Sequence, residues 1–365
     1  MPPVDKTPSS KALTAFLAKM DKTYGDGVFL LNPPIVPYDT ISTGSITLDY
    51  NLSVGGYVVG RMHEMWGADG VGKTTLNLLT AASAQRKFPD RIVVWVDVER
   101  RLDLAWAVSH GVDLSKFLHV RPSDAEEVAD QVKDMCRSGL VSYIVVDSIG
   151  AMIPEKEKEK DAGDAVVGKQ AQIVTRMVKI AAVEAEKTST TVMFINQVRA
   201  NVGGYGSPTT TGGGFALKHA TTTKLMVKRQ GGLEPLKARI DGEDRVVGHH
   251  IAVSIDRNSV APAYRVATFP LFHMATAKFG PIGIDAADEA TTIGLRTGVI
   301  QQAGAWYTIT TTGERVQGRD AVVEALRSSP QSVADVRARA LATVAGEVYA
   351  SESVAETDVA EGSDE

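Results

Sequence analysis

A glycine-rich motif constrains the fold of this chain more than any other feature. Residues 67–74 read Gly-Ala-Asp-Gly-Val-Gly-Lys-Thr and fit the pattern G-x-x-x-x-G-K-[ST]. The motif follows a short apolar run that ends near Trp66, and a helical pattern begins at Lys73. A strand, a phosphate-binding turn and a helix in this order are typical of an α/β nucleotide-binding core.

The motif also predicts which residues hold the nucleotide. Backbone amides in a glycine-rich turn wrap phosphates, and the N-terminus of the following helix favours their negative charge. We expect Lys73 to reach the β- and γ-phosphates of ATP and Thr74 to ligate Mg²⁺. The residues assigned to nucleotide binding at this turn are Gly67, Ala68, Asp69, Gly70, Val71, Gly72, Lys73, Thr74 and Thr75.

The chain beyond this motif alternates short apolar runs with helical patterns. Runs that read as strands lie at residues 92–96, 143–147 and 191–195. Helical patterns begin after Ser123, where residues 123–126 have capping-box spacing, and near Asp164. Such alternation predicts βαβ units and a mostly parallel sheet. Closely spaced runs, which predict antiparallel strands added to that sheet, follow at 224–228, 251–255 and 264–269.

We divide the chain into four expected parts. Residues 1–37 hold a short N-terminal helix and a linker whose prolines cannot continue a helix. Residues 38–271 form the α/β core, and residues 351–365 an acidic, disordered tail. Residues 272–350 form a small α+β domain, whose expected elements are a helix at 288–300, a hairpin at 306–316 and helices at 319–327 and 332–349.

Composition excludes several classes of protein. The chain has 365 residues, and none of its apolar runs approaches the roughly 20 residues that span a bilayer. The first residues lack the basic stretch and apolar core of a secretory signal. The single cysteine, Cys136, cannot form an intrachain disulfide or a multi-cysteine metal site. We therefore expect a cytoplasmic protein with no membrane partner.

The formal net charge of −5 argues at first against a nucleic-acid partner, because phosphate binding needs a basic surface. However, residues 351–365 carry six acidic and no basic side chains, so the other 350 residues have a formal net charge of +1. The charge therefore permits DNA binding without indicating it.

Three polar residues end or follow strands at the expected nucleotide site. Asp147 is expected to act on Mg²⁺ through water, although an aspartate that caps a turn is the simpler alternative. Glu99 is either the general base for the attacking water or a salt-bridge partner of Arg100 or Arg101. Gln197 either contacts the γ-phosphate or is an ordinary polar strand end, and the residues alone favour the second role.

A long glycine- and threonine-rich stretch follows Gln197 and contains Arg199 and Tyr205. Loops of this length inside a domain tend to be functional or mobile. Its amides, hydroxyls and arginine suit a phosphodiester backbone, and Tyr205 suits stacking on bases. A plain flexible connector accounts for the composition equally well. A second loop at 154–163 alternates charge and reads most simply as a solvated segment.

Motifs along the chain occur in the order found in bacterial RecA recombinases, and the resemblance spans about residues 11–329. They are Ile41-Ser42-Thr43-Gly44-Ser45 with Leu48-Asp49, Gly55-Gly56, Gly60-Arg61, the 67–74 turn, Val145-Val146-Asp147-Ser148, Phe194-Ile195-Asn196-Gln197-Val198-Arg199, Thr209-Thr210-Thr211-Gly212-Gly213-Gly214 and Ala303-Gly304-Ala305-Trp306-Tyr307. The nucleotide motifs are shared by many ATPases, but the 194–199 and 303–307 segments are specific. The resemblance implies a RecA-like P-loop ATPase core that uses ATP and Mg²⁺.

The resemblance also implies roles for single residues. Glu99 resembles the water-activating glutamate, Asp147 the Walker B residue and Gln197 the γ-phosphate sensor. Asp103 would read the adenine amino group, and Trp106 would stack on the base where the family usually has tyrosine.

Further implications concern DNA and assembly. The family forms an ATP-dependent filament on single-stranded DNA, pairs it with homologous duplex and exchanges strands. Segments 156–168 and 198–214 correspond to its two DNA-binding loops, which here contain Arg199, Asn201, Gly203, Gly204, Tyr205, Gly212, Gly213 and Gly214. The N-terminal helix resembles the element that packs on the next subunit. The C-terminal domain resembles one that binds duplex DNA, and the acidic tail resembles one that competes with this DNA for the same basic surface.

One departure from the family pattern bears on assembly. Members usually place two lysines, separated by one residue, where this chain has Arg257-Asn258-Ser259. Arg257 resembles an arginine finger that acts in trans on the neighbouring γ-phosphate, but Ser259 removes the second charge. Such divergence suits a phage-encoded or accessory member. It also leaves open a RecA-core repair ATPase, or a DNA-coating scaffold, without strand exchange.

Overall fold

The structure is a computed structural model that describes residues 10–25, 36–155, 168–200, 209–211, 217 and 219–360. Two compact units, residues 1–37 and 38–365, are described separately. In the first unit, the expected N-terminal helix is present as α1 (Ser10–Tyr24). No helix in the described ranges combines the length and apolar character needed to cross a bilayer.

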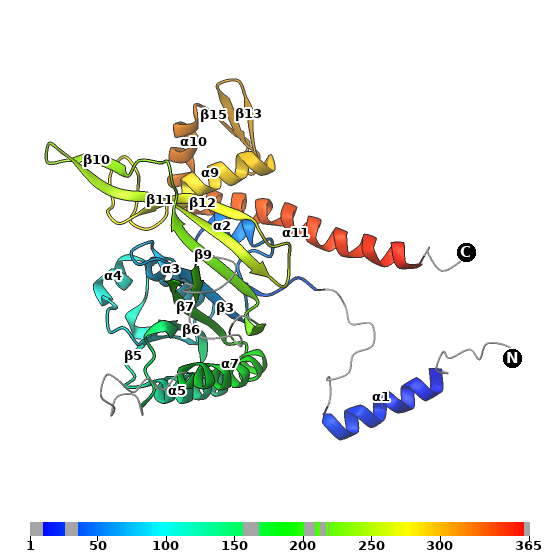
Figure 1. The fold of residues 1–365 in the computed structure, drawn as a ribbon. Helices are drawn as coiled ribbons and strands as arrows, with labels where there is room; N and C mark the ends of the chain where they lie inside the picture. The colour runs from blue at the N-terminus through cyan, green and yellow to red at the C-terminus, as the bar shows by residue number, and fades with distance from the viewer. Residues whose placement is uncertain are drawn as a thin grey trace. The chain divides into compact units, whose positions relative to one another are not determined.

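The larger unit is built on a mixed sheet (Figure 1) that has ten strands within the described residues. The strand order is β10-β11-β9-β3-β7-β6-β4-β5, with β12 paired to β11 and β8 to β7. The six strands from β9 to β5 are parallel, and β10, β11 and β12 extend the sheet in antiparallel pairs. The mostly parallel α/β core that the sequence predicts is therefore confirmed. The strands are β3 (Met62–Gly67), β4 (Ile92–Asp97), β5 (Phe117–Val120), β6 (Val141–Asp147), β7 (Thr191–Ala200), β8 (Thr209–Thr211), β9 (Thr223–Arg229), β10 (Leu236–Ile240), β11 (Glu243–Asn258) and β12 (Val266–Phe272).

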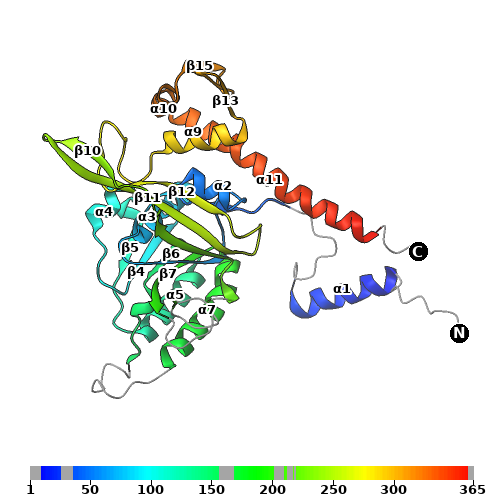
Figure 2. The ribbon, with the colours of Figure 1, turned by 45° about the horizontal axis from the view of Figure 1, so that its top comes forward.

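Helices cover both faces of the sheet (Figure 2), so its central strands are apolar on both sides. On one face α3 (Lys73–Lys87) and α4 (Leu104–Ser109) pack against the side of β6 that carries Tyr143 and Val145. On the other, α5 (Ala125–Ser138) and α7 (Lys169–Thr188) pack against Ile144 and Val146. Alternate residues of one strand thus belong to two separate cores.

Several helix boundaries differ from the sequence prediction, and two of the differences have a clear local cause. The N-cap of α5 is Asp124, not Ser123: its carboxylate accepts from the Glu127 amide, and Glu127 accepts in return from the Ser123 amide. The capping box is therefore shifted by one residue, because aspartate caps as well as serine does. Near the C-terminus, α9 (Ala286–Thr297) ends before the predicted residue 300, since Gly298 adopts a left-handed φ of +75°.

The C-terminal part is a small α+β assembly. It contains α9, a three-stranded antiparallel sheet of β13 (Ile300–Ala303), β14 (Trp306–Ile309) and β15 (Glu314–Gln317), and the helices α10 (Arg319–Arg327) and α11 (Pro330–Ala360). Ile293, Ile309, Leu326 and Val336 share its apolar core. Helix α11 continues through residues 351–360, where the sequence predicts a disordered tail; residues 361–365 lie outside the described part.

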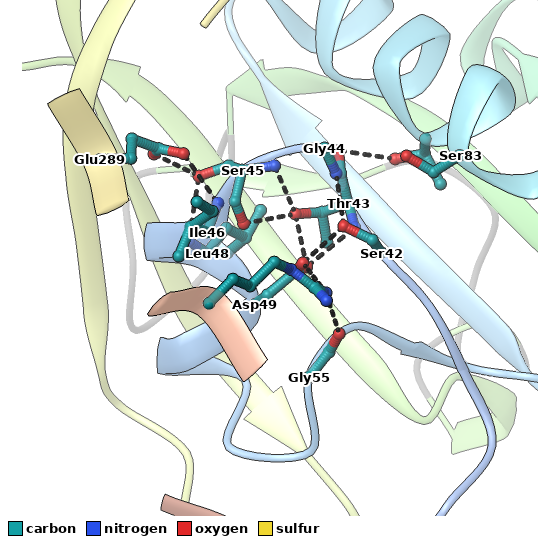
Figure 3. Close-up of polar contacts among 12 residues, drawn as sticks. Ser42, Thr43, Gly44, Ser45, Ile46, Leu48, Asp49, Gly55, Ser83 and Glu289 are labelled. Atoms are coloured by element: carbon teal, nitrogen blue, oxygen red, sulfur yellow. Dashed lines mark hydrogen bonds and ion pairs between the residues drawn. The ribbon is translucent and has the colours of Figure 1, made fainter. Parts of the chain in front are cut away.

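Two buried carboxylates connect this C-terminal part, through hydrogen bonds, to a short segment that precedes β3 (Figure 3). The segment comprises β1 (Thr40–Ile41), α2 (Ile46–Asn51) and β2 (Tyr57–Val58). Asp49 of α2 accepts from the Thr43 amide at 2.8 Å and from Arg337 of α11 at 2.7 Å. Glu289 of α9 accepts from the Ser45 hydroxyl at 2.6 Å and from the Ile46 amide at 2.7 Å. Hydrogen bonds to charged groups thus join α9 and α11 to α2.

The burial of Glu289 predicts a pH dependence of stability. Burial, with a smaller contribution from Asp49, raises the pKa of Glu289 from 4.5 to about 7. Folding therefore takes up a proton between these values, and this contribution to stability is lost as the pH rises through 7. Relative to Glu289→Gln, which does not titrate, the natural chain should lose roughly 2–3 kcal/mol of unfolding free energy between pH 5 and pH 8. Urea unfolding at both pH values measures this, and parallel pH profiles of the two proteins would contradict it.

Candidate nucleotide site

The glycine-rich turn connects β3 to α3 as the motif predicts. Two of its glycines are required by close packing: a Cβ at Gly67 would lie 2.3 Å from the Val227 carbonyl oxygen, and one at Gly72 would lie 2.4 Å from Leu271 Cδ2. Gly72 also has a left-handed φ of +101° directly before the helix. Gly67 is therefore needed because the Val227 backbone lies so close, and Gly72 because of its left-handed conformation.

A cavity of about 300 Å³ opens at this turn. Its lining comprises Asp69, Gly70, Gly72, Lys73, Thr74, Thr75, Glu99, Arg101, Leu102, Asp147, Ile195 and Gln197. These residues come from the carboxyl ends of β3, β7, β6 and β4, which are neighbours in the sheet. The structure thus brings the predicted phosphate, magnesium and water-activating residues to one place, where open α/β sheets bind ligands.

Lys73 lies inside the curve of the turn. Its Nζ donates to the carbonyl oxygens of Gly67 at 2.9 Å and Ala68 at 2.7 Å, and it is 3.9 Å from the Asp69 carboxylate. Burial lowers the pKa of Lys73, while Asp69, Asp147 and Glu99 oppose that shift. A buried ammonium at a helix N-terminus, beside glycine amides, forms a site that favours an anion.

Thr74 and Asp147 form the candidate magnesium position. The Thr74 hydroxyl donates to Asp147 Oδ2 at 3.4 Å. Burial, followed by repulsion from Glu99 and Asp97, raises the pKa of Asp147 to about 7. A cation beside Asp147 would offset both the cost of burying its negative charge and the repulsion from the neighbouring carboxylates. One carboxylate and one hydroxyl fit Mg²⁺, which takes few protein oxygens and completes its shell with water and phosphate.

Within the described ranges, no cluster of three or more His, Cys, Asp or Glu side chains is arranged to hold a metal ion by itself.

Glu99 has partners on both sides. Its Oε1 accepts from the Ser148 hydroxyl and, at 2.8 Å, from the Gln197 side-chain amide. Its Oε2 lies 3.4 Å from Arg101, whose side chain is 74% exposed. Both roles that the sequence leaves open for Glu99 are thus compatible with its position: it lies in the cavity, and it pairs with Arg101.

The structure brings Trp106, but not Asp103, to the turn. The Trp106 indole donates to the Thr75 hydroxyl at 3.3 Å and lines a second cavity of about 120 Å³ beside Gly72. Asp103 is exposed and caps α4 instead, accepting from the Ala105 amide at 2.8 Å. It lines neither cavity. Trp106 thus lies beside the turn and Asp103 does not, and the base-contact roles of both residues stay predictions.

The predicted DNA-binding loops lie mostly outside the described residues. This applies to residues 156–167 and to Asn201, Gly203, Gly204, Tyr205, Gly212, Gly213 and Gly214. Arg199 belongs to β7, whose last residues pair with β8 in the register Arg199 with Thr210. Residues 198–200 and 209–211 of the second loop therefore form a two-stranded antiparallel ribbon that continues directly from Gln197.

Arg257 lies on β11 and is absent from the lining of the cavity in its own chain. Its guanidinium donates to the His219 carbonyl oxygen at 3.5 Å. Arg257 therefore lies apart from the cavity-lining residues of its own chain, and its action at a neighbouring subunit stays a prediction.

Sequence reasoning did not assign a role to Asp97 or Ser148. Asp97 is buried and accepts from the amides of Arg101 and Leu102, both at 3.1 Å, so it shapes the turn that carries Glu99. The available signal was that Asp97 follows its apolar run just as Asp147 ends its own. Ser148 directly follows Asp147 and donates to Glu99.

A mostly parallel sheet, a glycine-rich turn with a buried lysine and acidic residues at neighbouring strand ends define a P-loop nucleotide-binding protein. Among solved structures, the chain resembles the crystal structure of the RadB recombinase at 22% identity and a TM-score of 0.48, over 64% of this chain and 96% of that one.

Comparison of the sequence with known proteins is more specific than the fold. The family model of the RecA N-terminal domain matches residues 11–277. The chain is 33% identical to protein RecA of Brucella anthropi over 338 residues, which cover 91% of this chain and 88% of the relative. It is 36% identical to protein RecA of Nautilia profundicola over 330 residues, 89% of each. On the family model and these relatives, the chain belongs to the RecA family.

Proposed function

We propose that this protein is an ATP-dependent recombinase that forms a filament on single-stranded DNA and catalyses homologous pairing and strand exchange. The observation that carries the proposal is the convergence of Lys73, Glu99 and Asp147 in one cavity at the end of a P-loop sheet. Similarity to proteins named RecA over about nine-tenths of the chain supports it.

In the proposed reaction, Lys73 and the amides of the turn hold the β- and γ-phosphates of ATP. Thr74 and, through water, Asp147 would hold Mg²⁺, which when bound neutralises charge on the phosphates. A water oxygen bonds to the γ-phosphorus as the bond to the bridging oxygen breaks, and the Glu99 carboxylate takes the proton of that water. Ser148 and Gln197 orient Glu99 through their hydrogen bonds. ADP and phosphate are the products.

The proposed DNA contacts follow from the same strand. Gln197 lines the cavity, and the second candidate loop, 198–214, begins at the next residue of β7. If Gln197 moves when it contacts the γ-phosphate, the adjoining residues of the loop should move with it, because both belong to the same strand end. The second loop, together with the first loop at 156–168, would bind the backbone and bases of single-stranded DNA.

An experiment on the unmodified chain tests this proposal. ATP hydrolysis should rise when single-stranded DNA is added, and negative-stain electron microscopy should show filaments on that DNA with ATP. The control is the same protein with DNA and no nucleotide, where we expect few filaments. Absence of both hydrolysis and DNA binding would contradict the proposal.

The acidic segment 351–365 provides a separate prediction. Its six acidic residues should compete with duplex DNA for the basic surface of the protein, so their deletion should strengthen duplex binding, most clearly at low salt. A full-length control with the six residues changed to Asn or Gln separates charge from chain length. Filter binding or fluorescence anisotropy at two salt concentrations measures the effect. Equal affinities of all three proteins would show that the segment does not compete.

A further inference from the structure

A row of polar side chains crosses the sheet from the nucleotide cavity toward Arg257. It begins beside Glu99, which accepts from the Gln197 side chain. The backbone N–H of Gln197 donates to Asn196 Oδ1 at 3.0 Å, and Asn196 Nδ2 donates to Glu64 Oε1 at 3.1 Å. These contacts lead from β7 to its neighbour β3, which carries the glycine-rich turn.

The row continues across the next two strands. Glu64 Oε2 lies 3.2 Å from Lys224 Nζ on β9, and this ammonium lies 5.3 Å from the ring centre of Trp66. The Trp66 indole N–H donates to Asp256 Oδ2 on β11 at 2.8 Å. Asp256 directly precedes Arg257. Hydrogen bonds, one ion pair and one cation–π contact thus connect Glu99 to the residue beside Arg257.

A β-bulge places the last member of this row. In the β9–β11 pair, Leu225 faces Ile255 but Lys224 faces Arg257, so Asp256 is an extra residue on β11. A bulge redirects side chains and bends its strand. Here the extra residue, Asp256, accepts the hydrogen bond from Trp66, and the bulge brings Arg257 opposite Lys224. The position of Arg257 therefore depends on a local irregularity that Trp66 and Asp256 hold.

The ion pair in the middle of the row is buried. The Glu64 side chain is fully buried, and that of Lys224 is 15% exposed. Charges in such a site lose their hydration, and removing either partner leaves the other uncompensated, so the pair tolerates little displacement. A buried pair of this kind often provides geometry more than net stability. This makes the row a stiff connection between two strand ends.

We propose that the cross-sheet relay positions Arg257 and thereby couples the nucleotide site of one subunit to that of its neighbour; its members are Asn196, Glu64, Lys224, Trp66 and Asp256. The inference rests on the proposed function, in which Arg257 acts at the next subunit. A shift of Gln197 at one cavity is transmitted through Asn196 to the strand that carries Arg257. Relay members are positioning residues, since none of them lines the cavity.

A double-mutant cycle tests the relay. Trp66→Phe removes the N–H that donates to Asp256 but keeps a ring near Lys224. We expect it to lower the DNA-stimulated kcat about 10-fold, with the KM for ATP nearly unchanged, because the phosphate turn is intact. When Arg257→Ala is already present, Trp66→Phe should cost nothing further, since both changes remove the same contribution.

Three further variants separate positioning from folding. Trp95→Phe makes the same chemical change in β4, where the buried Trp95 Nε1 has no hydrogen-bond partner among the described residues. It should leave kcat near that of the natural chain. Asp256→Asn keeps an oxygen that accepts from Trp66 and should retain most of the DNA-stimulated kcat. Asp256→Ala removes that acceptor and should lower the kcat as much as Trp66→Phe does.

The outcomes distinguish the relay from the function on which it rests. Additive losses in the Trp66→Phe, Arg257→Ala double variant, or a Trp66→Phe protein as active as the natural chain, would overturn the relay alone. A natural chain that does not hydrolyse ATP on DNA would overturn the proposed function and the relay with it. Non-additive losses together with rescue by Asp256→Asn would support the relay.

Discussion

Changing Glu99 to glutamine should lower ATP turnover by about 10²- to 10⁴-fold while ATP and DNA binding remain near normal. The glutamine keeps an oxygen that accepts from Ser148 and Gln197, so the cavity retains its shape. It cannot take a proton from the attacking water. Phosphate release measures turnover, and titration with ATP and with labelled DNA measures binding.

The alternative role of Glu99, as a partner of Arg101, is separated by a second variant. If the ion pair were the only function of Glu99, Arg101→Ala would reproduce the loss of Glu99→Gln. We expect it to retain most of the turnover, because Arg101 is largely exposed and lies on the other carboxylate oxygen. Hydrolysis at the natural rate by Glu99→Gln would remove the proposed base.

Changing Arg257 to alanine should lower DNA-stimulated hydrolysis on the order of 10²-fold or more and weaken ATP-dependent filaments. The reason is that the guanidinium would no longer reach the γ-phosphate of the adjacent subunit. Arg257→Lys keeps a charge but loses the planar, bidentate donor, so its rate should fall between those of the alanine variant and the natural chain.

Mixing two inactive variants tests action in trans directly. In a filament of Glu99→Gln and Arg257→Ala subunits, some interfaces combine an intact Glu99 with an intact Arg257 from the neighbour. At equal amounts and random order, about a quarter of the natural rate should return, because the interface is heterologous and each site draws on two subunits. A mixture as inactive as its components would argue that Arg257 acts within its own chain or not at all.

The sequence predicts the core of the site well because the signals are local. The glycine-rich motif, the strand-end positions of Glu99 and Asp147 and the alternation of strands and helices each depend on residues close together in the chain. Local patterns also account for the errors. Ser123 and Asp124 both suit an N-cap, and the helical pattern after Asp288 continues past Gly298, whose backbone ends the helix.

Other features depend on contacts that a local pattern does not contain. Glu64 and Lys224 are far apart in the chain and become partners only because β3 and β9 are adjacent in the sheet. The bulge at Asp256 leaves no signal in an otherwise regular apolar alternation. The helix-capping contacts of Asp103 are also missing from the prediction, which assigns this residue only to the base; that role stays a prediction.

A strand-exchange assay with and without ATP tests directly whether this protein is a recombinase. The substrates are a single-stranded circle and a linear duplex, either homologous or unrelated in sequence, and the products are separated by gel electrophoresis. We expect joint molecules and exchanged product only with ATP and only with the homologous duplex. DNA-stimulated hydrolysis and filaments without any homologous product would contradict it, and would identify the protein as a RecA-family ATPase that coats DNA without exchanging strands.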